Sequence, residues 1–346
     1  MKIIAEAGVN HNGSLETAMK MVDAAVAAGA DYIKFQTFHA HSLVTALCEA
    51  ADYQKENAGA STQKDMLKNL ELSFDEFKKL KEYCDEKGIG FLSTAFDEDS
   101  IDFIASLKPD YMKVPSGEIT NLPFLRKMAS TGIPVIISTG MSTPEEIAKA
   151  LNPFRKAGYA SEDMILLHCT TQYPTPMEDV NLLAMKTVSE NFGLLSGYSD
   201  HTLGIEIPIA AATLGASVVE KHFTLDRNME GPDHKASLEP DELAAMVKAI
   251  RNVTTALGNG IKEVKESERA NIEAARRSIV AKRPISKGQV ITEEDICTKR
   301  PATGLSPMLW DKVIGSRAIR DFKADEPIEL DGAFFKIEVG NWKFEM

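Results

Sequence analysis

Two histidines stand at the ends of apolar segments in the second half of the chain. His201 closes segment 197–201 and His222 closes segment 218–222, each with acidic, hydroxyl or lysine neighbours. They are 21 residues apart (222 − 201), too far for one helix face but typical of consecutive strands in a βα repeat. Two imidazoles that meet at strand ends can bind a metal ion and leave most of its coordination positions open for chemistry. The alternative is two unrelated histidines of the core or of loops.

The elements that position these histidines must come from a chain of 346 residues, which is enough for one large domain or two. Its hydrophobic content of 44% and charged content of 26% are typical of soluble globular proteins. A net charge of −12 argues against nucleic-acid binding, and no apolar run is long enough to predict a membrane span or signal peptide. Reduced thiols and a cytoplasmic location are expected, because no zinc or CxxC spacing is found among Cys48, Cys84, Cys169 and Cys297.

Short apolar runs alternate with amphipathic stretches over most of the chain. Strands are predicted at residues 3–5, 32–35, 89–92, 111–114, 134–137, 164–167, 193–195 and 217–219. Eight βα units in about 255 residues predict an α/β fold of the (β/α)8 TIM-barrel type. The alternative is a doubly wound sheet, but residues 8–13 (GVNHNG) do not match the GxGxxG loop typical of its first strand.

Helix starts are marked by capping residues. Ser73 is followed three residues later by Glu76, and Thr143 precedes a proline at the first helical position, Pro144. Both patterns predict helices that begin directly after the serine or threonine.

The composition changes near residue 262, which predicts a second, smaller unit. Within that unit, residues 292–296 are predicted as a capped short helix. Residues 39–72 are long and polar for a βα connection, which is typical of a functional lid or of a disordered segment; after the second strand it would lie over the barrel mouth. The predicted organisation is a barrel catalytic domain at 1–262, a linker at 263–278, a small β-rich domain at 279–335 and a tail at 336–346.

Polar side chains follow every predicted strand, where TIM-barrel enzymes carry their active sites. Lys34 and Lys113 lie inside otherwise apolar strands, where a lysine is costly unless it is paired or bound to an anion. Short hydroxyl donors are available nearby. Together with the lysines they predict a phosphate site, and they are Thr94, Ser116, Ser138 and Ser199.

Eight motifs in this order carry a resemblance to a known family. They are IAEAGVNHNG (4–13), KFQT (34–37), KVPSGE (113–118), STGM (138–141), YPTP (173–176), GYSDH (197–201), EKHFT (220–224) and GPDHKAS (231–237). From about residue 3 to 330 the chain resembles the sialic acid synthase family, which condenses phosphoenolpyruvate with an N-acylated mannosamine-type sugar to give a nonulosonic acid and phosphate. The C-terminal unit resembles the antifreeze-like (SAF) domain of that family.

The resemblance implies a role for individual residues. His201 and His222 match metal ligands, with Mn²⁺ expected and Mg²⁺ or Co²⁺ as alternatives, and Glu6 matches a catalytic acidic residue close to the metal and its water. Arg300 matches an arginine that one subunit of a domain-swapped homodimer inserts into the barrel of its partner. The phosphoenolpyruvate contacts match Lys34, Thr94, Lys113, Ser116, Ser138 and Ser199, and the sugar contacts match Gln36, Glu118, Tyr173 and Asp233.

One position departs from the sialic acid synthases proper. Thr171 stands where they often carry asparagine, as in members that resemble legionaminic acid synthases. The sugar is therefore left open between N-acetylmannosamine and 2,4-diacetamido-2,4,6-trideoxymannose. Two other functions also remain open at this point: a metal-free aldolase with a Schiff base at Lys34 or Lys113, and a sugar-binding protein without catalysis.

Overall fold

The computed structural model describes residues 1–43 and 63–331. The chain divides into two units, Met1–Gly258 and Asn259–Met346, and the division falls four residues (262 − 258) before the expected end of the barrel domain. Each unit has its own hydrophobic core.

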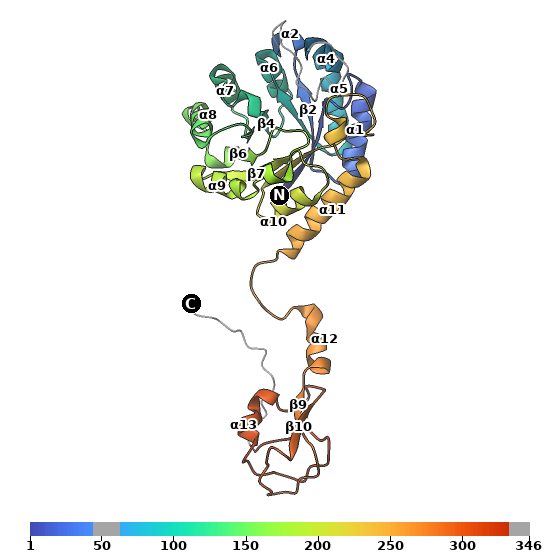
Figure 1. The fold of residues 1–346 in the computed structure, drawn as a ribbon, viewed down its shortest axis with the longest axis vertical. Helices are drawn as coiled ribbons and strands as arrows, with labels where there is room; N and C mark the ends of the chain where they lie inside the picture. The colour runs from blue at the N-terminus through green and yellow to red at the C-terminus, as the bar shows by residue number, and fades with distance from the viewer. Residues whose placement is uncertain (44–62, 332–346) are drawn as a thin grey trace. The chain divides into compact units, whose positions relative to one another are not determined.

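The first unit is a closed barrel of eight parallel strands that neighbour one another in sequence order (Figure 1). The predicted (β/α)8 fold is confirmed. The strands are β1 Lys2–Gly8, β2 Tyr32–Thr37, β3 Gly90–Ala95, β4 Met112–Val114, β5 Val135–Ser138, β6 Met164–His168, β7 Leu195–Asp200 and β8 Val218–His222.

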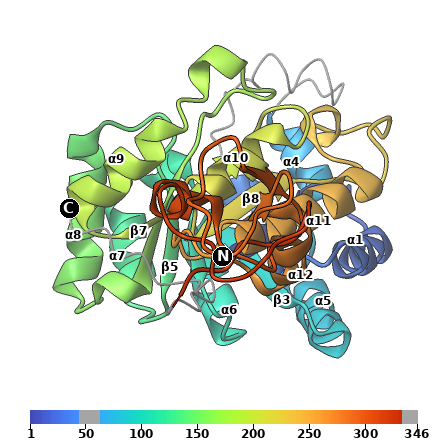
Figure 2. The same ribbon diagram turned by 90° about the horizontal axis from the view of Figure 1, so that it is seen from below.

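Helices surround the strands, and Figure 2 shows several of them following one another around the outside. The helices are α1 Leu15–Ala28, α2 Ala40–Leu43, α4 Gln63–Leu70, α5 Phe74–Lys87, α6 Glu98–Ser106, α7 Leu122–Ala129, α8 Pro144–Lys156, α9 Leu183–Phe192, α10 Glu206–Thr213 and α11 Pro240–Ala256. Short 3-10 turns are η1 Ser116–Glu118, η2 Ser161–Asp163, η3 Met177–Asp179 and η4 His234–Ala236.

The predicted helix starts are confirmed, whereas the predicted seventh strand is wrong in its position. Ser73 and Thr143 each form a capping box, at the start of α5 and of α8. Gly193, in the left-handed conformation, ends α9, so β7 begins two residues later and runs on to Asp200. The polar residues at the end of β7 therefore belong to the barrel wall.

Side chains inside the barrel form an apolar floor and a polar layer. The floor consists of Ile4, Leu92, Ile136, Ile165, Leu167 and Val218, with Tyr32 and Tyr111 packed against it. Because strand side chains alternate between faces, the residues two positions further along these strands also point inward. From Ile4, Tyr32, Tyr111 and Val218 this step leads to Glu6, Lys34, Lys113 and Glu220.

The flanks of the predicted lid pack against the loop that follows β1. Val9 forms a small apolar cluster with Phe38 and Ala40 from one flank and with Leu67 and Leu70 from the other. The middle of this segment, residues 44–62, lies outside the described residues.

The second unit contains helix α12 Glu266–Ala275 and an antiparallel pair, β9 Ser278–Ala281 with β10 Ile296–Lys299. Two short elements follow, η5 Pro307–Leu309 and α13 Trp310–Val313. The helix predicted at 292–296 is wrong: the carboxylate of Asp295 accepts hydrogen bonds from the backbone N–H and hydroxyl of Thr292, which closes a turn before β10.

Two further predictions are the tail and the absence of a membrane span. The predicted tail at 336–346 lies outside the described residues. Across the described part of the chain, no helix combines the length and hydropathy that a membrane span requires.

Candidate active site

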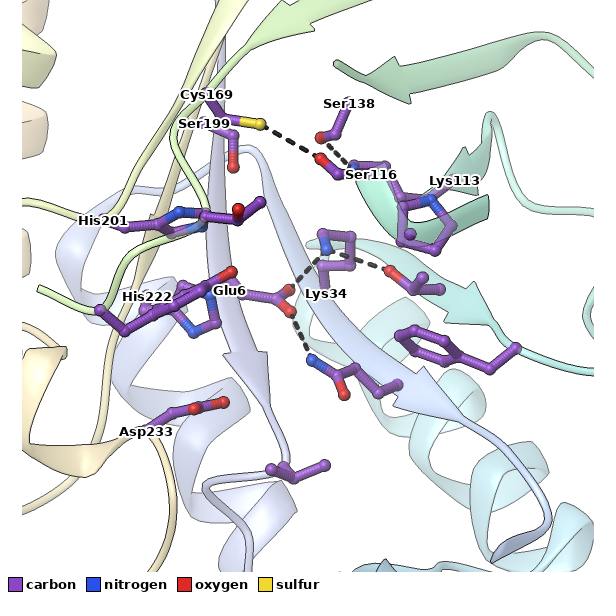
Figure 3. Close-up of a pocket in the computed structure, with 18 of the residues that line it drawn as sticks. Glu6, Lys34, Lys113, Ser116, Ser138, Cys169, Ser199, His201, His222 and Asp233 are labelled. Atoms are coloured by element: carbon purple, nitrogen blue, oxygen red, sulfur yellow. Dashed lines mark hydrogen bonds and ion pairs between the residues drawn. The ribbon is translucent and has the colours of Figure 1, made fainter. Parts of the chain in front are cut away.

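A cavity of about 400 Å³ opens where the barrel strands end, and each strand or the loop after it supplies part of its lining (Figure 3). Residues that are far apart in the sequence meet in this cavity. Those of the predicted site that line the cavity are Glu6, Lys34, Gln36, Thr94, Lys113, Ser116, Ser138, Thr171, Tyr173, Ser199, His201, His222 and Asp233.

Two predicted residues are not among the lining residues. Glu118 is half-buried, and its carboxylate accepts a hydrogen bond of 2.6 Å from the side chain of Asn121. Arg300 belongs to the second unit and is exposed in it. Their roles toward the sugar and toward a partner subunit stay predictions.

Two lysine ammonium groups lie at the bottom of the polar layer, and both residues are only 3% exposed. Nζ of Lys34 lies 3.0 Å from a carboxylate oxygen of Glu6 and 3.5 Å from one of Glu220. Nζ of Lys34 donates to the hydroxyl of Thr94 (3.1 Å), whereas Nζ of Lys113 donates to the hydroxyl of Ser138 (2.5 Å). Both cations are therefore held in place by protein groups before any anion binds.

Charges in this layer shift one another's pKa values. Burial would raise the pKa of Glu220, but Lys113 and Lys34 outweigh it and lower that pKa to about 2. Burial would lower the pKa of Lys34, but Glu220 and Glu6 raise it. Burial dominates for Glu6, whose pKa rises to about 7, and for Lys113, whose pKa falls. Glu220 is thus an ionised partner of Lys34, while Glu6 titrates near neutral pH.

Hydroxyl groups complete a socket for an anion. The hydroxyl of Ser116 accepts from the backbone N–H of Gly140 (3.0 Å) and lies 3.3 Å from the thiol of Cys169. A Cβ atom on Gly140 would lie only 2.6 Å from the methyl of Thr171 and 2.9 Å from the Ser116 hydroxyl, so only glycine permits this close approach. Ammonium and hydroxyl donors that converge in one buried space are suited to phosphate and carboxylate groups.

The two histidines lie beside this socket, with ring centroids 5.4 Å apart. Nδ1 of His201 donates to the carbonyl of Thr170 (2.6 Å), which leaves a lone pair on Nε2, whereas Nδ1 of His222 is buried without a hydrogen-bond partner. Burial lowers the pKa of His201 to about 4 and that of His222 well below its ordinary value. Both rings are therefore neutral, as metal ligation requires.

These residues fit a metal ion held by few protein ligands. Metal–nitrogen distances of about 2.1 Å allow one ion to reach both rings at their observed separation. Among residues 1–43 and 63–331, no group of three or more histidine, cysteine or acidic side chains is placed to hold a metal. Two nitrogen donors alone suit an ion that keeps open positions for substrate and water, and not a closed structural zinc site.

A buried ion pair lies next to the histidines on strands β7 and β8. Nζ of Lys221 lies 2.5 Å from the carboxylate of Asp200, and neither side chain is exposed to solvent. The two residues are opposite each other in the β7–β8 register, one position before His201 and His222. The pair therefore ties together the two strands that carry the histidines.

We expect Lys221→Met to lower the free energy of unfolding by about 3–5 kcal/mol, because Asp200 would keep a buried charge without its partner. Denaturant unfolding followed by circular dichroism measures the change. Lys87→Met, which breaks an exposed pair with Asp23, is the matched control and should change little. Equal effects of the two substitutions would contradict a structural role of the buried pair.

Some lining residues had no role in the sequence prediction. Glu220 lies two positions before His222, so the period of a strand places it on the same face, and that signal could have identified it. The other lining residues were assigned no role from the sequence. Those that lie inside the motifs are Val9, Pro115, Gly117, Met141 and Pro232, and those outside them are Phe38, Leu43, Leu67, Leu70, Phe96 and Cys169.

Comparison with known proteins decides the family. The model of the NeuB family matches residues 21–262, and that of the SAF domain matches residues 276–332. The chain belongs to the NeuB family. The resemblance inferred from the motifs and the antifreeze-like character of the small unit are thereby confirmed.

NeuB-family relatives match nearly the whole chain. The N,N'-diacetyllegionaminic acid synthase of Campylobacter jejuni is 48% identical over 94% of this chain and 98% of its own length. The synthase of the same name from Legionella pneumophila is 47% identical over 93% of this chain and 91% of its own. A crystal structure of the sialic acid synthetase from Leptospira borgpetersenii, 36% identical, superposes with a TM-score of 0.67 over 78% of this chain and 90% of that one.

Proposed function

We propose that this protein condenses phosphoenolpyruvate with an N-acylated mannosamine-type sugar, giving a nonulosonic acid and phosphate. The observation that carries the proposal is one cavity that contains both a buried two-lysine anion socket and a pair of neutral histidines. The names of the NeuB-family relatives, which are synthases of legionaminic and sialic acids, support it.

Phosphoenolpyruvate carries a phosphate and a carboxylate, and the socket offers a cation for each. Lys34 and Lys113 supply the two cations. Glu6 and Glu220 hold Lys34 in place, so its charge costs little further reorganisation when the anion enters. The hydroxyl donors described above orient the phosphate.

In the reaction, C3 of phosphoenolpyruvate forms a bond to the aldehyde carbon, whose oxygen takes up a proton and becomes a hydroxyl. Water adds to C2 and gives up its protons, and the C2–O bond to phosphate breaks, which leaves a 2-keto acid and inorganic phosphate. A divalent ion held by His201 and His222, which we propose to be Mn²⁺ with Mg²⁺ or Co²⁺ as alternatives, would supply Lewis-acid stabilisation of the aldehyde oxygen. Glu6 lies in the same cavity and takes the proton from the attacking water, a role that its pKa of about 7 suits.

Of the two sugars left open by the sequence, we propose 2,4-diacetamido-2,4,6-trideoxymannose. The legionaminic acid synthases are 47–48% identical to this chain, and the sialic acid synthetase of known structure is 36% identical. Thr171 lines the cavity with a side chain shorter than the asparagine that often stands there in sialic acid synthases, which leaves more room for a second acetamido group.

The test is phosphate release from phosphoenolpyruvate with both sugars, with and without Mn²⁺ after removal of metal by EDTA. We expect metal-dependent release with both sugars and a higher kcat/KM with the diacetamido sugar. No release from either sugar would contradict a synthase and favour a binding protein. Activity in EDTA together with borohydride trapping of a keto acid would instead favour the Schiff-base aldolase.

We further propose a domain-swapped homodimer in which Arg300 reaches the partner's cavity, which the exposure of Arg300 on the small unit supports. We also propose a cytoplasmic location, which the free thiols of Cys84, Cys169 and Cys297 support.

The swap can be tested with two variants, Arg300→Ala and His222→Ala, each of which should be inactive alone. Mixed after co-refolding, they should regain up to about a quarter of wild-type activity, because one site of each heterodimer is intact. No recovery in verified heterodimers would contradict the swap.

A further inference from the structure

The loop after β1 and the loop after β8 are joined by side-chain hydrogen bonds at the edge of the cavity. The amide of Asn12 donates to the backbone carbonyl of Glu230 (2.9 Å), and Nε2 of His234 donates to the side-chain oxygen of Asn12 (3.2 Å). Asp233, which lines the cavity, lies between these two attachment points in the sequence. Asn12 and His234 themselves are not among the lining residues.

The ring of His234 is fixed on both sides. The hydroxyl of Thr224 lies 2.7 Å from Nδ1, and the Asn12 oxygen can only accept, so Nε2 carries the hydrogen and Nδ1 accepts from Thr224. The side chain of His234 is fully buried, and burial lowers its pKa, so the ring stays neutral in this arrangement. A neutral imidazole with one donor and one acceptor satisfies both neighbours.

The backbone on both sides of this contact is strained or crowded. Asn12 has φ = 51°, a left-handed conformation that asparagine tolerates better than most residues. Gly231 has φ = 157°, and a Cβ there would lie 2.6 Å from the ring of His234. Strained backbone persists where the surrounding contacts hold it, and such positions cluster at functional sites.

A second set of hydrogen bonds reaches Asp233 from the same loop after β1. The amide of Asn10 donates to the carbonyl of Phe223 (2.9 Å) and to the hydroxyl of Ser237 (3.0 Å). That hydroxyl in turn donates to the backbone carbonyl of Asp233 (2.7 Å). The segment that carries Asp233 is therefore held before and after this residue.

We propose that Asn12 and His234 are positioning residues for the sugar: they hold the loop after β8 so that Asp233 keeps its place at the cavity. This inference rests on the proposed function, in which Asp233 contacts the sugar. The strand residues that would contact phosphoenolpyruvate lie on β2, β3, β4, β5 and β7; they are Lys34, Thr94, Lys113, Ser138 and Ser199. Loss of this Asn12–His234 clamp should therefore affect the sugar and leave phosphoenolpyruvate binding intact.

The test substitution is Asn12→Gly, because glycine keeps the left-handed backbone and removes both side-chain hydrogen bonds. We expect the KM for the sugar to rise about tenfold and the KM for phosphoenolpyruvate to change less than about twofold. Asn12→Asp retains the acceptor for His234 but loses the donor to the Glu230 carbonyl, so it should recover only part of the loss. Tyr159→Phe, which removes one hydrogen bond to the carbonyl of Ile133 on the outside of the barrel, is the matched control and should leave both constants unchanged.

Thermal unfolding of each variant tests whether it is folded. If Asn12→Gly is not folded, Thr224→Val is used in its place, because it removes the hydroxyl that holds the His234 ring. The KM for the sugar should then rise in the same way. The clamp is overturned if the KM values for both substrates rise together, or if the sugar KM of Asn12→Gly equals that of the wild type. A wild-type protein without turnover would overturn the proposed function, and the clamp with it. Normal turnover by the wild type, together with an unchanged sugar KM in Asn12→Gly, would overturn the clamp and leave the proposed function in place.

Discussion

Replacing His222 with alanine should lower kcat/KM at least about 10³-fold and abolish Mn²⁺ binding. Nδ1 of this histidine is buried without a hydrogen-bond partner, and its ring lies 5.4 Å from that of His201. One imidazole alone is a weak site for a divalent ion, and among the described residues no group of three or more histidine, cysteine or acidic side chains could take its place. Phosphate release measures the activity, and electron paramagnetic resonance of free Mn²⁺ measures binding independently of turnover.

The control for this substitution is His41→Ala, which removes an exposed histidine that is not among the lining residues of the cavity. It should bind Mn²⁺ and turn over as the wild type does. If His222→Ala kept its Mn²⁺ affinity and a kcat/KM within tenfold of wild type, the two-histidine metal site would be wrong.

Replacing Lys113 with methionine should weaken phosphoenolpyruvate binding by about two orders of magnitude or more and lower kcat as well. Methionine preserves the length and the packing of the buried stem, so the main change is the loss of one ammonium group from the socket. The hydroxyl of Ser138 would lose its donor at 2.5 Å, and Lys34 would face the ligand alone. Calorimetric titration with phosphoenolpyruvate in the absence of sugar isolates this step.

Lys127→Met is the matched control, because this lysine pairs with Asp102 on the outside of the barrel. Its phosphoenolpyruvate affinity should equal that of the wild type. A Lys113→Met protein that is folded by circular dichroism and binds phosphoenolpyruvate normally would show that the anion socket lies elsewhere.

Much of the barrel could be predicted from sequence because its signals are local. Alternating strands and helices with Ser73 and Thr143 as caps predict the fold, and a polar residue directly after an apolar run predicts the edge where the site lies. The position of β7 could not be predicted in the same way. Its C-terminal half is polar yet buried, and such residues are typical of loops until their partners, such as Glu220 for Ser199, are known.

The features of the site that could not be predicted from the sequence depend on contacts between distant segments of the chain. The period of its strand could place Glu220 in the cavity, but its role as a partner of the lysines is evident only from the structure, where Lys34 lies 3.5 Å away and the charges of Lys113 and Lys34 lower its pKa. The hydrogen bond between Asn12 and His234 joins residues that are 222 positions apart (234 − 12), and no periodic pattern in the sequence predicts it. The role of Arg300 depends on a second subunit and stays a prediction.

The apolar floor beneath the polar layer makes the cavity blind-ended. In the part of the chain that the structure describes, both reactants therefore enter, and both products leave, at the strand ends. The reactant seated deeper must therefore bind before the other, and the product derived from it departs after the other has gone. Steady-state kinetics should accordingly be ordered and not random, and an analogue of the outer reactant should trap the inner one inside.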